Sequence, residues 1–309
     1  MKKLEIVLPS ISKPKNKSSK LKKQVVPSVK RCLQLVNLAD DLAEETREEA
    51  NKLGFMSRLL LMVNLPYRDP GAECRNWWRK NGNVSINVTS GYKDDESIGI
   101  PYGAYPRLIL AYLVTQAVKT NSPQIFLGQS FSQFITFLGV KRGGKQYKQL
   151  QLQLKRTLSA AFSWTYETDK RWSRINIQVS HESHFWWDPV EDDNVLPFWE
   201  SYIKLNTDFF NEIIRHTVPL DLRVLSVLKN SPLGLDLYMF ISWRVYNLNK
   251  PIFISWESLQ QQLGGQYADV NVFSRDCRMH ITRIKALRPD LKINFLQGRL
   301  LLKPSFYQN

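Results

Sequence analysis

Ser130-Phe-Ser-Gln-Phe-Ile-Thr-Phe-Leu-Gly139 is a ten-residue segment whose pattern recurs 125 residues later as Ser255-Trp-Glu-Ser-Leu-Gln-Gln-Gln-Leu-Gly264. Each copy predicts a short helix that ends at a glycine. A strand-like apolar run precedes each copy, at 125–127 and at 252–254, and a longer helix with basic and amide side chains follows it. The order strand, helix, turn, basic helix therefore occurs twice and indicates two helix-turn-helix units.

Charge is distributed unevenly along the 309 residues, which carry a formal net charge of +15. Residues 1–31 contain ten Lys or Arg and one acid, with prolines and serines and little apolar periodicity. Such a composition predicts a disordered basic arm over residues 1–30. Two further basic blocks, 141–174 and 271–309, flank an acidic stretch at 181–221. The alternation predicts two surfaces that face a polyanion.

The remaining chain is long enough for two modest hydrophobic cores. We expect an α+β fold with two tandem winged-helix domains, at 65–218 and 219–309. A helical lead-in over 31–64 precedes them, packed on the first domain or serving as a dimerisation helix. In the first domain a β-hairpin over 163–179 would be the wing, with Lys170, Arg171 and Arg174 at its tip. In the second, 293–295 and 300–302 would form the wing through Gln297-Gly298.

Helix faces identify candidate base-reading side chains, because residues on one face recur at 100° per residue. In helix 144–162, Tyr147, Leu150, Leu154 and Leu158 face inward. In helix 270–286, an apolar stripe that includes His280 faces inward. Arg and Lys can donate to guanine, Gln can pair with adenine, and an exposed Leu can contact a thymine methyl. The predicted DNA-binding residues are Lys145, Lys148, Gln149, Leu152, Lys155, Arg156, Arg275, Arg278, Met279, Thr282 and Arg283, together with the hairpin-tip residues Lys170, Arg171 and Arg174. Trp164 and Trp172 are candidates for stacking on nucleic acid.

Catalytic and metal-binding patterns are weak in this sequence. The four histidines lack the spacing of a metal-dependent nickase, and no phosphate-binding glycine loop is present. An acidic cluster at 188–193 is more typical of a solvated loop than of a Mg²⁺ site. We therefore expect no enzyme activity, no catalytic residue, no cofactor and no metal. Three widely spaced cysteines and the lack of a long apolar run predict a cytoplasmic protein without a membrane span.

Residues 65–162 resemble the plasmid RepA replication-initiator family. The matching blocks are Leu65-Pro-Tyr-Arg-Asp-Pro-Gly71, Trp78-Arg-Lys-Asn-Gly82, Gly99-Ile-Pro-Tyr-Gly103 with Pro106-Arg107-Leu108, and Leu127-Gly-Gln-Ser130 with Phe134 and Leu138-Gly139. The resemblance implies binding to repeated plasmid origin sequences (iterons) in double-stranded DNA and local origin opening. It also implies recruitment of the host initiator and the replicative helicase, and dimers that repress their own promoter. A winged-helix transcriptional repressor without initiator activity is the alternative, and a homodimer stays open.

Overall fold

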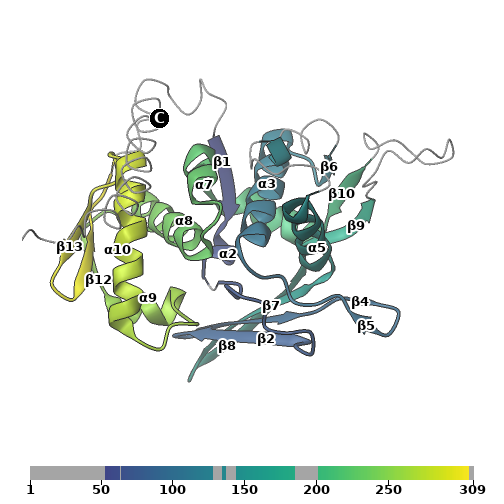
Figure 1. Cartoon of the computed structure of the whole chain (residues 1–309), viewed down its shortest axis with the longest axis horizontal. Coiled ribbons are helices and arrows are strands. Elements are labelled where there is room, and N and C mark those ends of the chain that lie inside the picture. The colour runs from purple at the N-terminus through teal and green to yellow at the C-terminus, as the bar shows by residue number, and fades with distance from the viewer. Residues whose placement is uncertain (1–52, 63, 128–133, 137–143, 185–200, 306–309) are drawn as a thin grey trace, which may run out of the picture. The chain divides into compact units, whose positions relative to one another are not determined.

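The computed structural model describes residues 53–62, 64–127, 134–136, 144–184 and 201–305. The predicted basic arm over 1–30, most of the lead-in over 31–64, most of the first short helix and the acidic cluster at 188–193 lie outside these ranges. Two groups of described elements follow the same order along the chain (Figure 1). We name them the first and second repeat.

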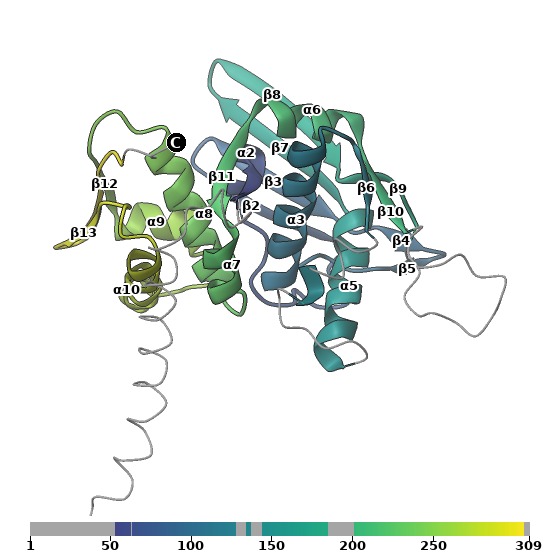
Figure 2. The same ribbon diagram turned by 90° about the horizontal axis from the view of Figure 1, so that it is seen from above.

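The second repeat matches the elements predicted from the sequence. It consists of α8 (Pro232–Tyr246), β12 (Ile252–Ser255), α9 (Trp256–Leu263), α10 (Val270–Leu287), β13 (Ile293–Leu296) and β14 (Arg299–Leu302). Its strands form an antiparallel sheet in the order β12-β14-β13. In both views α10 lies beside α8 and α9 (Figures 1 and 2). The predicted helix pair and hairpin are confirmed as elements.

The first repeat has the same order with one insertion. It consists of α3 (Ala104–Thr120), β6 (Gln124–Phe126), a helical turn at 134–136, α5 (Lys145–Ser159), β9 (Ser180–His184) and β10 (Tyr202–Leu205). The sheet order β6-β10-β9 corresponds to β12-β14-β13. The β9–β10 hairpin therefore takes the position that β13–β14 takes in the second repeat.

The hairpin predicted as the first wing is present, as β7 (Ala161–Thr168) and β8 (Arg171–Gln178), but it belongs to a different sheet. It joins β2 (Asn76–Asn81) and β3 (Val84–Thr89) in the antiparallel order β2-β3-β7-β8. Apolar residues that alternate along both central strands explain the pairing, because Ile86 lies opposite Trp164 and Val88 opposite Phe162 on the buried face. The assignment of this hairpin as the wing is therefore wrong.

The predicted lead-in helix is also corrected where it is described. Residues Leu53–Ser57 form a strand, β1, that pairs with β11 (Thr217–Asp221), and only α2 (Arg58–Met62) is helical. Alternating burial along β1 accounts for the strand. The predicted domain boundary at 218/219 falls inside β11. Two helices, α6 (Thr207–Arg215) and α7 (Leu222–Leu228), and the small β4–β5 hairpin (Tyr92–Lys93, Glu96–Ser97) complete the described elements.

A buried polar cluster joins the two repeats; we call it the junction. From α3, Arg107 is 4% exposed and donates to both carboxylate oxygens of Asp236 on α8, at 2.7 and 2.8 Å. It also donates to the carbonyls of Leu65 and Gly103. Asn64 donates to the same carboxylate at 2.7 Å. Because each partner is hydrogen-bonded, the buried charges are compensated.

Candidate nucleic-acid interface

Hydrogen bonds fix both helices of the second repeat's pair and the turn between them. The Ser255 and Asp269 side chains cap α9 and α10 by accepting from backbone N–H groups. Gly264 ends α9; a Cβ there would lie 2.6 Å from Gln260 Cγ, so the turn requires glycine. In the same turn, Tyr267 donates to Asp276 on α10 at 3.2 Å. The two helices are thus held at a fixed angle by short-range contacts.

The inward face of α10 is the one predicted. Phe273, Cys277, Ile281 and Ile284 are fully buried. His280 is 6% exposed, and its Nε2 lies 3.0 Å from Ser231 Oγ. Burial lowers the pKa of this imidazole, and the nearby Arg283 guanidinium lowers it further. His280 is therefore a packed core residue, as expected from its place on the apolar side of the helix.

The outward face of α10 carries four of the predicted residues. Arg275 is 73% exposed, Met279 is 46% exposed and Thr282 is exposed. The spacing 275, 279, 282 places them on one stripe. Arg283 is half-buried on the flank of that stripe. Arg275 forms an ion pair with Asp276, which contributes little at such exposure.

Arg278 connects α10 to the β13–β14 hairpin. Its guanidinium lies over the rings of Trp256, at 4.8 Å, and Phe295, at 5.0 Å. Lys285 lies over the same Phe295 ring. Cations stacked on aromatic rings are held in place while their charge stays accessible. Arg278 and Lys285 thus place two cations between α10 and the hairpin, and Arg299 on β14 adds a third, stacked on Phe253.

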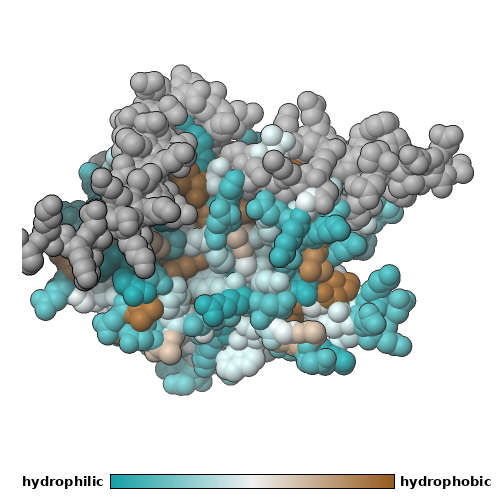
Figure 3. Space-filling view, viewed as in Figure 1, coloured by the Kyte–Doolittle hydropathy of each residue, from teal (hydrophilic) through white to brown (hydrophobic). Residues whose placement is uncertain are grey.

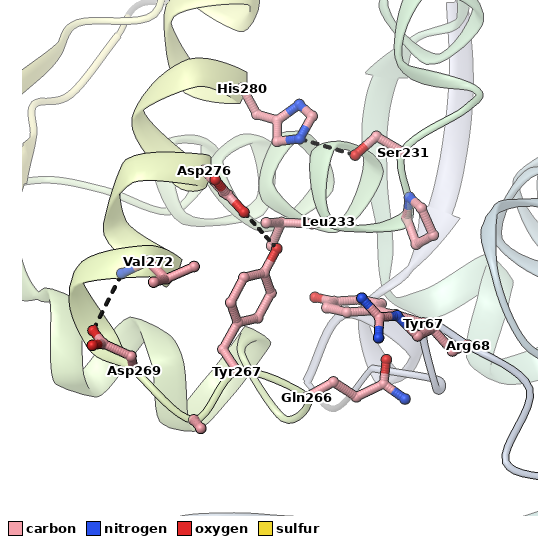
Figure 4. Close-up of a pocket in the computed structure, with 12 residues that line it drawn as sticks. Tyr67, Arg68, Ser231, Leu233, Gln266, Tyr267, Asp269, Val272, Asp276 and His280 are labelled. Carbon is pink, nitrogen blue, oxygen red and sulfur yellow. Dashed lines mark hydrogen bonds between the residues drawn. The ribbon is translucent and has the colours of Figure 1, made fainter.

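A hollow of about 550 Å³ lies on the other flank of α10 (Figure 4). Asp269, Val272, Asp276 and His280 line it from the helix, and Tyr267 points into it from the turn. Burial and the Asp276 carboxylate raise the pKa of Tyr267 to about 12. Arg68 also lines the hollow, but on the α10 side the carboxylates of Asp269 and Asp276 make this flank unfavourable for a polyanion. The basic side of α10 is therefore the one that leads toward the hairpin.

In the first repeat, α5 presents a matching stripe. Lys145, Lys148 and Lys155 are exposed, and Leu152 is 37% exposed between them. In the space-filling view, hydrophilic side chains lie at the upper part of α5, and a small hydrophobic patch lies at its lower end (Figure 3). Tyr147, Leu150, Leu154 and Leu158 are buried, as predicted. The described part of α5 contains no acidic residue, which differs from an ordinary solvated face.

Arg156 and Gln149 depart from the predicted stripe because a loop covers their side of α5. Arg156 is 12% exposed; it donates to the carbonyls of Ile98 and Ile100, and its guanidinium lies over the Tyr102 ring. Gln149 donates to the Tyr102 hydroxyl at 3.0 Å. Gly99 has φ +97°, and a Cβ there would lie 2.7 Å from Arg156 Cζ. We therefore remove Arg156 from the base-reading set.

The hairpin-tip residues are exposed but lie on the four-stranded sheet. Lys170 and Arg171 are exposed near the β7–β8 turn, while Arg174 donates to Asn176 and Ser163 on the sheet surface. Trp164 is 4% exposed and stacks on Phe162, so it does not contact a ligand. Trp172, in contrast, is 62% exposed.

Several residues of structural or electrostatic importance were not predicted. Tyr102 and Gln153 hold the 98–102 loop on α5, with the Gln153 side chain accepting from Tyr102 N at 2.9 Å. Asp236 neutralises Arg107 from 129 residues away. Trp78 is 71% exposed on β2. The hydrogen-bonded pairs among these residues are 51 and 129 residues apart, so no local sequence pattern could predict them. Among the described residues no group of three or more His, Cys, Asp or Glu side chains is arranged to hold a metal ion.

These observations define an α+β chain whose described elements form two repeats of the same order, each with basic residues on a long helix, α5 or α10. The family model described as "Plasmid encoded RepA protein" matches residues 100–258, just over half of the chain. The chain belongs to this family. The match runs from the loop before α3 through the first repeat and into α9.

Solved structures with a similar fold come from RctB. One is the crystal structure of selenomethionine derivatives of its domains 2 and 3. The sequence identity to that chain is 13%, the alignment covers 81% of this chain and 97% of that chain, and the TM-score is 0.51. A second structure of RctB domains 2-3 is 15% identical over 79% of this chain and 96% of that chain, with a TM-score of 0.44. The first similarity shows the fold alone. No curated protein sequence matches the chain. In the part of the chain that the structure describes, no helix combines the length and apolar character that crossing a bilayer requires.

Proposed function

We propose that this protein is a plasmid replication initiator that binds repeated origin sequences in double-stranded DNA through two winged-helix modules. In each module the second helix of the pair, α5 or α10, enters a major groove. The observation that carries the proposal is the surface of α10 and its hairpin, where Arg275, Met279 and Thr282 form one exposed stripe beside the stacked Arg278.

The chemistry of this stripe suits base recognition. Arginine donates to guanine O6 and N7, and apolar side chains such as Met279 can contact a thymine methyl. The β13–β14 turn beside the helix would contact the phosphate backbone, as wings do. On α5, Lys145, Lys148 and Lys155 would add phosphate contacts around the exposed Leu152. In this proposal the chain acts by binding and not by catalysis.

Membership of the RepA family supports the initiator role, and the basic charge supports binding to DNA. Origin opening and recruitment of the host initiator and replicative helicase belong to the same proposal. Autorepression by a homodimer would use the same helix surfaces on the promoter.

Footprinting on the DNA that flanks the coding region tests the proposal. We expect protected repeats, and a labelled repeat duplex should bind more tightly than a scrambled duplex. Arg275→Ala should weaken specific binding by about 1–3 kcal/mol and relax base preference at one position. Arg215→Ala, which removes an exposed cation at the end of α6, is the matched control and should leave that preference unchanged. Equal binding to repeat and scrambled duplexes would contradict the proposal.

A replication assay then separates initiator from repressor. A plasmid that carries the repeats but lacks an initiator gene should replicate only when the protein is supplied. Specific binding without replication would favour the repressor.

A further inference from the structure

The sheet β2-β3-β7-β8 has one face without a described covering element. Residues opposite one another in an antiparallel pair lie on the same face. The strand registers therefore define an outer face with four rows: Asn76, Thr89, Ala161 and Gln178; Trp78, Asn87, Ser163 and Asn176; Lys80, Ser85, Thr165 and Arg174; and Glu167 and Trp172. Hydrogen bonds across the rows, such as Ser163 to Asn176 at 2.7 Å, agree with this assignment.

The opposite face of the same sheet packs against the protein. Ile86, Val88, Phe162, Trp164 and Ile177 are at most 4% exposed. In Figure 1, α2, α3 and α5 lie above the sheet, and no labelled element lies below it. The outer face is thus open to a ligand along the described part of the chain.

Two tryptophans stand on the two edge strands of the outer face, two rows apart. Trp78 on β2 is 71% exposed and Trp172 on β8 is 62% exposed. Three strand spacings and four residues along a strand separate them, which corresponds to about 20 Å. Large aromatic side chains gain free energy when their rings are covered, so two such rings exposed on one face indicate a ligand surface.

The floor between the tryptophans is polar and basic. Its central side chains are Ser85, Asn87, Ser163 and Thr165, and cations stand at both edges of one row as Lys80 and Arg174. Arg174 is held on this face by donating to Asn176 at 2.9 Å and to Ser163 at 3.2 Å. Glu167 is the one acid in the four rows. At the β7–β8 turn beside Trp172, Lys170 is exposed together with Asp169, and Arg171 pairs with Thr168 in the row that faces the other side of the sheet.

This combination distinguishes between possible ligands. A protein partner would need a contiguous apolar patch, but no aliphatic side chain larger than Ala161 lies in the four rows. A DNA duplex keeps its base faces stacked, so side chains on a sheet surface cannot stack on them. Single-stranded nucleic acid offers unstacked bases to aromatic rings and phosphates to cations, and amide and hydroxyl groups can bond base edges.

We propose that the outer face of β2-β3-β7-β8 binds single-stranded DNA, with bases stacked on Trp78 and Trp172 and the backbone near Lys80 and Arg174. This site is separate from the α5 and α10 surfaces and goes beyond duplex recognition. In an initiator it would hold one strand of DNA that has been opened. Arg174, predicted from the sequence as a wing residue, then contacts single-stranded DNA.

Fluorescence anisotropy with the full chain and a labelled oligothymidine tests the proposal. The parent protein should bind the oligonucleotide, and stacking should quench tryptophan fluorescence. Trp78→Ala and Trp172→Ala should each weaken binding on the order of 5- to 100-fold, and together they should remove most of the quenching. Trp78→Phe should keep most of the affinity, because its ring still stacks. Lys80→Ala with Arg174→Ala should make the slope of log affinity against log salt shallower, by about 0.7 for each phosphate that the protein no longer neutralises.

Matched controls separate this site from the duplex site and from folding defects. Tyr246→Ala removes another exposed aromatic ring, at the end of α8, and should leave oligothymidine affinity unchanged. The tryptophan variants should keep the melting temperature and the affinity for a repeat duplex, whereas Arg275→Ala should lose only the duplex affinity. Failure of duplex binding would thus contradict the proposed function and leave this inference standing.

Three results would overturn the inference. One is equal oligothymidine affinity for the parent and the Trp78→Ala/Trp172→Ala double variant, which would leave the tryptophans to a protein partner. Another is loss of affinity in Tyr246→Ala as large as in the tryptophan variants. The third is tighter binding of oligouridine than of oligothymidine, which would assign the face to RNA.

Discussion

Arg156 holds the loop over residues 98–102 against α5. Its guanidinium donates to two backbone carbonyls, stacks on Tyr102 and lies 3.5 Å from the Asp69 carboxylate. Hydrogen bonds from a charged donor contribute more to stability than neutral ones. We expect Arg156→Ala to lower the free energy of unfolding by about 2 kcal/mol and to leave the ratio of specific to non-specific DNA binding unchanged.

Urea unfolding and competition binding check this expectation. Lys155→Ala, one residue earlier on α5, is the control, and it should weaken DNA binding while the unfolding free energy changes by less than about 0.5 kcal/mol. A relaxed base preference in Arg156→Ala at unchanged stability would return this residue to the base-reading set.

His280 makes stability depend on pH. Burial lowers the pKa of its imidazole in the folded chain, whereas an unfolded histidine titrates near about 6.5. Between these two values the unfolded chain binds a proton that the folded chain does not. The free energy of unfolding should therefore fall as the pH drops through this window.

Urea midpoints measured at about pH 7.5 and about pH 5.5 test the contribution of His280. His280→Gln keeps a side chain that can bond Ser231 but does not titrate. We expect its midpoint to change less between the two pH values than that of the parent. The same change in both proteins would assign the pH dependence to other groups.

At the scale of single residues, the sequence predicts which side chains are buried more accurately than it predicts which exposed side chains are free to bind DNA. The inward stripes of α5 and α10, and the packed His280, follow from helical periodicity. Arg156 and Gln149 are the exceptions, because periodicity places them within the exposed stripe although a loop covers them. The loop that covers them comes from about 50 residues earlier in the chain, and a helical projection contains no information about it.

Among the elements, α3 and α8 depend on each other through the junction. Arg107 and Asp236 are both buried, and removing one partner leaves the other charge uncompensated. We expect Asp236→Ala to lower the free energy of unfolding by about 3–5 kcal/mol. Chemical denaturation followed by circular dichroism measures the loss.

The paired replacement Arg107→Met with Asp236→Leu distinguishes charge compensation from packing. It removes both charges and fills much of the volume, so its loss should be smaller than that of Asp236→Ala. A double variant at least as unstable as Asp236→Ala would show that the bonds from Arg107 to the carbonyls of Leu65 and Gly103 dominate.

Element order in the second repeat could be predicted because each element is short, amphipathic and bounded by turn residues. The first repeat was predicted less well for a topological reason. The β7–β8 hairpin alternates like a wing, yet its apolar face fits β3, which lies more than 70 residues earlier. Strand pairing is decided by such distant partners, and the same is true of β1 with β11.

At the scale of the molecule, residues 45–309 form one compact unit that contains both repeats. Besides the Arg107–Asp236 pair, Tyr67 donates to the Leu263 carbonyl and Arg79 to that of Gln261, so the end of α9 is tied to the segment that precedes the first repeat. Burial raises the pKa of Tyr67 well above its ordinary value, so this phenol stays a hydrogen-bond donor. Helix α3 and the segment before it are thus tied to α8 and to the end of α9 by hydrogen bonds, in contrast to modules on a flexible linker.

A rigid connection predicts how the protein responds to the spacing of its DNA half-sites. Inserting about half a helical turn, roughly 5 base pairs, between the half-sites turns one of them to another face of the duplex. Inserting a full turn restores the face but adds about 34 Å. Modules on a flexible tether would recover affinity with the full turn. Repeats held by the junction would not, so both insertions should weaken binding about tenfold or more, as measured by competition with the unmodified duplex. The same insertions placed outside the site should have no effect, and Asp236→Ala, which loosens the junction, should tolerate the full-turn insertion better than the parent protein does.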